Sequence, residues 1–161
     1  MSKGLSELIV DGKLNGIAIG DNFNAFKKEA GVILLQDQIG DIPALYEFEH
    51  EGLKYEISCI KEVVVGISLK LDLYLDMLFQ IPLKSGHLID FGFKVDFVDF
   101  IKSLNYNGID WEIDKLDTGE KAVGLLMQSN TKLMYSFHKD FFGFYQAVNF
   151  SLELYHTLRD K

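Results

Sequence analysis

The stretch VVVGISLKLDLYLDMLFQIPL, residues 63–83, decides the fold, because every odd-numbered position in it is apolar. Most of its even-numbered positions are polar, charged or glycine, and this alternation is typical of a β-strand with one buried face. A straight strand of that length would extend about 70 Å at about 3.3 Å per residue, whereas a domain of this size is about 40 Å across. The run therefore has to bend, and we expect the bend in its most polar segment, residues 72–76.

Shorter alternating segments on both sides of this run predict the rest of a sheet. Glu51-Gly52 and Lys61-Glu62 are turn-forming pairs that separate neighbouring strands. The expected strands are residues 16–20, 44–50, 53–60, 87–93, 109–114, 122–128, 133–138 and 141–150. Residues 3–10 predict either a short helix or an extended segment, and Ser151 can cap a terminal helix over residues 152–159.

Two pairs of phenylalanines mark the remaining predicted helices. Asn22 and Asp96 can cap helices over residues 23–30 and 97–105, and each helix carries two phenylalanines three residues apart. This spacing places both rings on one helix face, where they can pack against a sheet. The rings are Phe23 and Phe26 in the first helix and Phe97 and Phe100 in the second.

These helices belong to a wider internal similarity. After each one comes an aromatic, acidic, apolar, acidic segment, Tyr46-Glu47-Phe48-Glu49 and then Trp111-Glu112-Ile113-Asp114. The sequence therefore predicts one α+β domain over residues 1–161, with two tandem strand–helix–meander repeats at about 14–84 and 87–150. Its mostly antiparallel sheet would carry both helices on one face. Chance similarity between amphipathic segments is the alternative explanation of the repeat.

Composition and charge narrow the classes of function. Apolar residues make up 48% of the chain and aromatic residues 13%, which is enough for an ordered core. The formal net charge of −8 opposes binding to phosphate backbones, so we expect no nucleic-acid partner. A basic protein is the electrostatic complement, although acidity can also serve solubility alone. The chain starts without an apolar signal segment and has no apolar run of about 18 residues, so we expect a cytoplasmic protein without a membrane partner.

A search for catalytic and ligand-binding motifs finds none. The chain has no glycine-rich phosphate loop, no G-x-S-x-G and no H-E-x-x-H. Its single cysteine, Cys59, lies on the apolar side of a predicted strand, which favours a core thiol over a nucleophile. The four histidines, His50, His87, His138 and His156, have no metal-ligand spacing. We therefore expect no enzyme activity, metal or cofactor, and a pair of catalytic carboxylates is the alternative left open.

Two acidic stripes are the feature that points to a partner. Strand alternation places three acids on one side of each of two predicted strands. The candidate partner-binding residues are Glu47, Glu49, Glu51, Asp110, Glu112 and Asp114. Such stripes can steer a basic partner to its binding site. They can equally form a solvated sheet face, or a charged edge that prevents aggregation.

The chain also resembles a known family. The resemblance is carried by Gly16-Ile17-Ala18-Ile19-Gly20-Asp21, Leu53-Lys54-Tyr55-Glu56-Ile57 and Asn107-Gly108-Ile109-Asp110-Trp111-Glu112, and it extends over roughly residues 8–150. These segments are similar to those of short bacterial cytosolic proteins that include immunity proteins of toxin–immunity pairs. The resemblance implies a non-enzymatic protein that binds and neutralises a cognate toxin, of which a basic nuclease is one example. Residues 36–42 and 72–84 depart from the family pattern, which leaves the strand order open.

A small-molecule-binding domain is the competing hypothesis. The second half is rich in aromatic residues that could line the concave face of a curved sheet and enclose an apolar ligand. These residues are Phe91, Phe93, Tyr135, Phe137, Phe142 and Phe144. An adjacent toxin gene would favour the immunity protein, whereas a closed apolar pocket would favour the ligand-binding domain.

Overall fold

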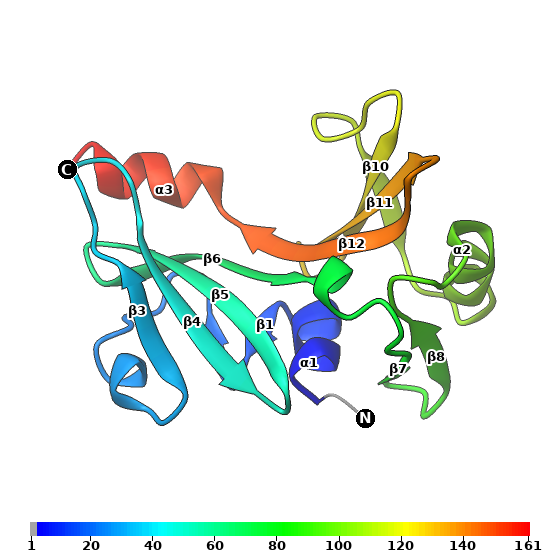
Figure 1. Ribbon diagram of the computed structural model, residues 1–161, viewed down its shortest axis with the longest axis horizontal. Helices are drawn as coiled ribbons and strands as arrows, with labels where there is room; N and C mark the ends of the chain where they lie inside the picture. Colours follow the sequence, from blue (N-terminus) through cyan, green and yellow to red (C-terminus); the bar gives the residue numbers. More distant parts are fainter. Residues whose placement is uncertain (1–2) are drawn as a thin grey trace.

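An antiparallel sheet of eight strands occupies the centre of the protein in the computed structural model, which describes residues 3–161 (Figure 1). The first two residues of the predicted domain lie outside this range. The strands run in the order β3-β4-β5-β6-β12-β11-β10-β9. Their bounds are Val32–Gln36 (β3), Ala44–His50 (β4), Leu53–Ile60 (β5), Val63–Lys70 (β6), Trp111–Asp114 (β9), Ala122–Met127 (β10), Lys132–His138 (β11) and Phe141–Phe150 (β12).

Helices and two small hairpins complete the fold. The helices are α1 (Lys3–Asp11), α2 (Phe97–Tyr106) and α3 (Leu152–Arg159), with single 3-10 turns at η1 (Phe26–Lys28) and η2 (Leu71–Leu73). One hairpin pairs β1 (Lys13–Leu14) with β2 (Ile17–Ala18), and the other pairs β7 (Phe79–Pro82) with β8 (Leu88–Phe91). The predicted α+β class with a mostly antiparallel sheet is confirmed. Within residues 3–161, no helix combines the length and the apolar character that a membrane span requires.

The two halves of the chain use the same succession of elements. Each half has a hairpin, a helical segment and then a meander of four consecutive strands, β3–β6 in the first half and β9–β12 in the second. The last strands of the two meanders pair in the middle of the sheet, with Lys70 opposite Gln146 and Gly66 opposite Phe150. The strand order of the second meander is therefore the reverse of that of the first, on the two sides of this central pair. Duplication of one repeat stays a prediction.

The alternating run at residues 63–83 bends as expected. β6 ends at Lys70, η2 turns the chain out of the large sheet, and β7 begins in the separate hairpin (Figure 1). Apolar side chains are buried before and after the bend, for example Leu69 and Ile81. Between them, Leu73, Leu75 and Met77 are exposed, so the alternation continues in sequence through a segment that no longer has a sheet to pack against.

The predicted helix over residues 23–30 is wrong, because only the 3-10 turn η1 forms there. Instead of capping a helix, Asn22 accepts a hydrogen bond through Oδ1 from the N–H of Asn24. The N–H of Phe23 donates to the carbonyl of Glu62 at 2.7 Å, which holds this part of the chain against the start of β6. Glu29 is extended and ends the turn. By contrast, Asp96 and Ser151 do cap α2 and α3, each accepting a backbone N–H.

The phenylalanines pack as predicted although the predicted helix over residues 23–30 does not form. Phe23 and Phe26 contact Tyr46 and Phe48 with ring centroids 4.7 and 5.0 Å apart. On α2, Phe100 is buried and Phe97 is half-buried against β11 and β12. The turn η1 and the helix α2 therefore cover the same face of the sheet, which is the core face.

Helix α1 also packs on the core face and links the two halves. At its start, the N–H groups of Lys3 and Gly4 donate to the carboxylate of Glu51 in the β4–β5 turn. Near its end, Thr131 donates through Oγ1 to the carbonyl of Leu8, and Ser129 donates to the carbonyl of Ile9. Figure 1 shows α3 on the opposite side of the sheet, so the helices do not all share one face.

Candidate functional site

The sheet face that points away from α1 and α2 collects five of the six predicted partner-binding acids. We call it the open face, although α3 packs on it against β5 and β6. Glu47 and Glu49 come from β4, while Asp110, Glu112 and Asp114 lie in or just before β9. Strand alternation turns these acids outward because the residues between them, such as Phe48 and Trp111, pack into the core. One continuous sheet thus carries both stripes on the same sheet face.

The two stripes lie at opposite ends of the open face. Successive strand pairings place one transverse row of residues across the sheet, in the order Glu47, Glu56, Ser68, Val148, Lys132, Leu126 and Glu112. Six strand intervals of about 4.8 Å separate the first of these from the last, or about 29 Å along the sheet. The stripes are therefore two separate acidic regions with a mixed surface between them.

Glu51, the sixth acid, is placed differently. It lies in a turn with a positive φ of 53° and contacts the N-terminus of α1. The Nε2 of His50 lies 3.0 Å from a carboxylate oxygen of Glu51. Although partial burial acts in the opposite direction, the N–H groups of Lys3 and Gly4 hold the pKa of Glu51 below its ordinary value. This carboxylate is occupied in capping the helix.

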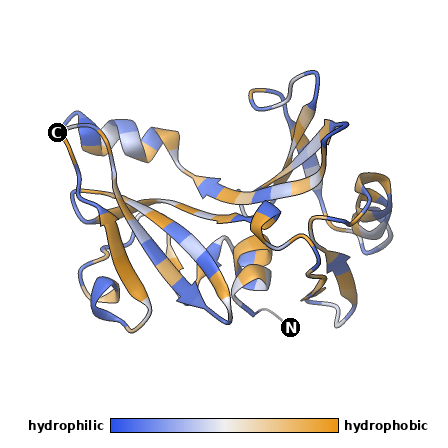
Figure 2. Ribbon diagram, in the orientation of Figure 1, coloured by the Kyte–Doolittle hydropathy of each residue, from blue (hydrophilic) through white to orange (hydrophobic). Residues whose placement is uncertain are grey.

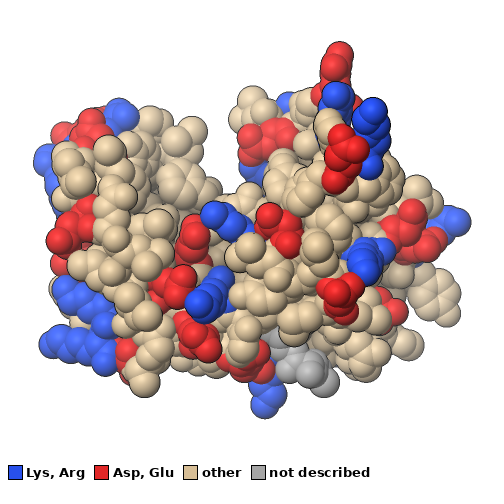
Figure 3. All heavy atoms as spheres, viewed as in Figure 1, with Lys and Arg blue, Asp and Glu red and all other residues tan. Residues whose placement is uncertain are grey.

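Lysines from neighbouring strands neutralise much of the open face. Glu47 pairs with Lys54 at 3.9 Å, and the adjacent Glu56 pairs with Lys70 at 3.6 Å. Figure 3 shows acidic and basic side chains intermingled across the middle of the molecule. Among residues 3–161, Glu49 and Glu112 are the predicted acids whose carboxylates form no ion pair or hydrogen bond, so the uncompensated charge lies toward the two ends of the face.

The β9 end of the open face has the denser network. Lys132 of β11 lies 2.9 Å from Asp114 and also contacts Asp117 in the loop after β9. The hydrogen bond from Lys132, together with the N–H of Leu116, holds the pKa of Asp114 below its ordinary value. Asp110 accepts a hydrogen bond from Gln128 at 3.0 Å. Both acids are therefore fixed in position, with Glu112 free between them.

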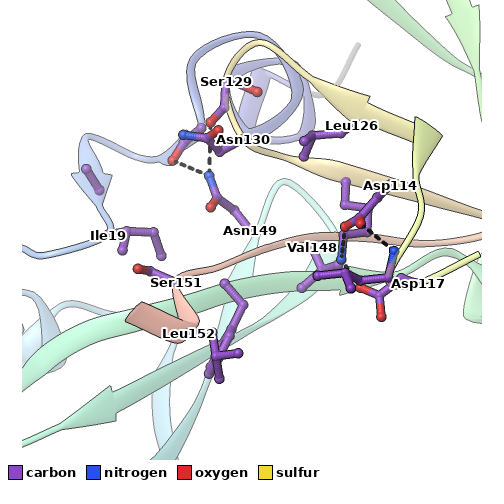
Figure 4. A pocket seen from close by; sticks show the side chains of 15 residues that line it. Ile19, Asp114, Asp117, Leu126, Ser129, Asn130, Val148, Asn149, Ser151 and Leu152 are labelled. Carbon is purple, nitrogen blue, oxygen red and sulfur yellow. Dashed lines mark hydrogen bonds and ion pairs between the residues drawn. The ribbon is translucent and has the colours of Figure 1, made fainter. Parts of the chain in front are cut away.

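A pocket of about 750 Å³ lies beside this network (Figure 4). One wall carries Lys132 and its two aspartates, and the opposite wall carries Asn149 and Ser129. The Asn149 side chain donates to the carbonyls of Ser129 and Gly12 at 3.3 and 3.5 Å. Apolar side chains complete the lining, namely Ile19, Leu126, Leu152 and Val148. In Figure 3 the molecule is hollowed between the α3 side and the β10–β11 arm, where this pocket opens.

Sequence reasoning missed the polar residues that build this pocket. The alternation of residues 132–136 does place Lys132 on the polar side of its strand. Its contact with Asp114, however, depends on β9, β10 and β11 being neighbours. The sequence does not mark Asn149 as a binding residue, because this residue interrupts an otherwise apolar strand face without belonging to a motif.

The aromatic residues of the competing hypothesis pack into the core. Phe91, Tyr135 and Phe144 are buried, and the rings of Phe91 and Phe144 lie 5.0 Å apart. Phe93 is also buried, whereas Phe137 and Phe142 are exposed at the end of the β11–β12 hairpin. These rings support α2 and do not line the open face.

The remaining reactive groups form no visible catalytic arrangement. Cys59 is buried in the core, and burial raises the pKa of its thiol to about 12. Over the part of the chain that the structure describes, no three His, Cys, Asp or Glu side chains gather in a way that could hold a metal ion.

Comparison with known proteins leaves the geometry as the basis for interpretation. Protein-family models, curated proteins and solved structures were compared with the chain, and none of them matches it. The open face, with an acidic region at each end and a pocket between α3 and β9, is therefore the candidate functional site.

Proposed function

We propose that this protein is a non-enzymatic binder of a basic partner protein, with the immunity protein of a toxin–immunity pair as the leading case. One observation carries the proposal: five predicted acids from the two halves of the chain share the open face. Charges on one face can attract a partner of opposite charge over a distance and orient it before contact. The net charge of −8 extends the same attraction to the whole molecule.

The charge pattern also specifies the partner. Lys54, Lys70 and Lys132 offset Glu47, Glu56 and Asp114 on the open face, whereas Glu49 and Glu112 are uncompensated. A suitable partner therefore presents basic side chains at two places and a more neutral surface between them. A nuclease that binds a phosphate backbone has such basic side chains, and an acidic face laid over them would exclude the nucleic acid.

The test is a titration against the product of an adjacent toxin-like gene. Glu112→Lys should weaken binding at least tenfold and remove protection of cells that express the toxin, because a charge that steers and contacts the partner is reversed. Asp90→Lys is the matched control, since Asp90 is an exposed strand acid on β8, outside the large sheet. Equal affinity of both variants and of the parent, without salt dependence, would contradict the proposal.

A small-molecule ligand is the second candidate, and the pocket favours it. Its volume of about 750 Å³ lies in the range of ligand sites, and it combines apolar walls with a lysine and an asparagine. The ligand would be polar with an apolar part. Binding in this pocket would be lost on Leu126→Arg, which fills the pocket, and would be unchanged by Asp90→Lys.

A further inference from the structure

The strand β3 forms one edge of the sheet and is unusually apolar for an edge. In the described chain its sole neighbour is β4, and its sequence, VILLQ, contains no charged residue and no proline. Ile33 is 56% exposed, Leu34 45% and Leu35 49%. Figure 2 shows this strand as a continuous hydrophobic segment at the side of the molecule. Exposed edges usually carry charges or prolines that prevent pairing with another chain.

The loop after β3 carries two more exposed apolar residues. Ile39 and Ile42 pair through two backbone hydrogen bonds and are 61% and 54% exposed. Neighbouring exposed apolar side chains such as Ile33, Leu34 and Leu35 typically mark a surface that another protein covers. The β-bulge between Leu34 and Gln36 opposes such pairing, because it limits the length over which another strand could align with β3.

The free backbone groups of β3 can be assigned. The N–H of Glu49 donates to the carbonyl of Gly31, and the register places Ile33 opposite Glu47. Because antiparallel pairs alternate between hydrogen-bonded and non-hydrogen-bonded positions, the N–H and C=O of Leu34 point away from β4. Leu34 therefore presents both a donor and an acceptor at the centre of the free edge.

We propose that β3 pairs antiparallel with β3 of a second copy of this chain, with the two Leu34 residues facing each other across a two-fold axis. The same two hydrogen bonds then form in both directions, as a symmetric interface requires. Side chains of Ile33 and Leu35 from opposite copies become neighbours and are removed from water.

The lack of charge on β3 favours an equally uncharged strand, such as β3 of a second copy, over a charged segment of another protein. Two chains of net charge −8 repel each other, and the uncharged strand is where they can approach at the smallest electrostatic cost. The ends of the strand are also self-complementary. Lys28 precedes β3 and Asp37 follows it, and both side chains are exposed. Antiparallel pairing brings Lys28 of one copy to the end where Asp37 of the other lies.

The experiment is sedimentation equilibrium of the full chain up to about 1 mM, the weak end of the affinity scale. The parent should dimerise, and Ile33→Lys should raise the dissociation constant at least tenfold. Val98→Lys is the matched control, because Val98 on α2 is also 56% exposed and the change in charge is the same. It should leave the dimer unchanged.

Charge reversal tests the antiparallel register. Lys28→Glu and Asp37→Lys should each weaken the dimer about threefold, and the double variant should restore it, since the two-fold axis brings Lys28 of one copy to the same end of the paired strands as Asp37 of the other. A parent that stays monomeric, or a dimer that Ile33→Lys does not weaken, would overturn the proposal. If the parent is a monomer and Ile33→Lys abolishes its binding to the basic partner, β3 is a binding site for that partner and the dimer proposal is wrong. Glu112→Lys should not affect the dimer, so this proposal and the proposed function can fail independently.

Discussion

The two edge strands of the sheet occupy equivalent places and differ in almost every side chain. β3 and β9 are each the first strand of a four-stranded meander and each has one neighbour among the described strands. β3 reads VILLQ, without charge, whereas β9 reads WEID, with two acids. Charged side chains at an edge discourage pairing with another strand. The difference teaches that the two edges of one sheet can differ in how readily they pair: β3 carries no charge that would oppose another strand, whereas the acids of β9 do oppose one.

The largest expected effect tests whether the two edges belong to one folding unit. Phe100 is 1% exposed beneath the β9 half and contacts Phe91 and Phe144. Phe100→Ala should lower the free energy of unfolding by about 3–5 kcal/mol, because a large core cavity results. Urea unfolding followed by circular dichroism measures this change, with the exposed Phe142→Ala as the control. Two separate transitions would show that the edges belong to halves that unfold independently, and the comparison would then concern two domains.

A smaller effect is expected at the ion pair beside β9. Lys132→Met should cost about 1 kcal/mol, the upper end for pairs near a surface. The pKa of Asp114 is lower in the folded protein than its ordinary value, so this carboxylate stabilises the fold above about pH 4. That stabilisation is lost as the pH falls through the lowered folded value. The difference in the free energy of unfolding between Lys132→Met and the parent should therefore disappear in acid. The control Lys139→Met should have the same free energy of unfolding as the parent at every pH.

Two acids near the end of β4, Glu49 on the strand and Glu51 in the turn that follows, should differ in how much they contribute to the free energy of unfolding. Glu51→Gln removes the charge at the N-terminus of α1 and should cost about 0.3–1 kcal/mol. Glu49→Gln changes an exposed acid without a partner in the described chain and should stay within about 0.5 kcal/mol of the parent. Thermal unfolding of the two variants side by side makes the measurement. Equal midpoints would mean that Glu51 does not cap the helix.

The smallest effect on stability should come with a change in assembly. Glu112→Ile makes β9 resemble β3 and should alter the free energy of unfolding by less than about 0.5 kcal/mol. With both edges apolar, dimers should associate further, which light scattering would detect as species larger than dimers. In the double variant Glu112→Ile/Ile33→Lys, assembly should stop at dimers formed through β9, because the lysine blocks pairing through β3. Unchanged assembly would show that the charge on β9 does not protect that edge.

Sequence alone predicts the local elements where one strong pattern acts. The alternation in residues 63–70 predicts β6, and the polar residues that follow predict its end. Asp96 and Phe100 predict α2 with its cap and its buried ring. The similar segment at Asn22 fails because Phe23 donates to the carbonyl of Glu62 and Val64 donates to the carbonyl of Asp21. These backbone hydrogen bonds tie the segment to the start of β6 and override a short helical preference.

The open face could be predicted only in part. Alternation correctly turns Glu47 and Glu112 away from the core, but it cannot show that one sheet contains both. That depends on the pairing of β6 with β12, between residues such as Gly66 and Phe150 that are far apart in sequence. For the same reason, the lysines that neutralise the acids come from strands whose neighbours are unknown until the fold is known.

Helix α1 gives the protein a particular order of events during synthesis. It is made early, but the hydrogen bond that Thr131 donates to Leu8 joins residues 123 positions apart. At translation rates of about 5–20 residues per second, the helix is complete roughly 6–25 s before this partner exists. Contacts of such long range slow folding in general. The end of α1 at Leu8 and Ile9 therefore lacks these partners on the nascent chain until the second meander leaves the ribosome.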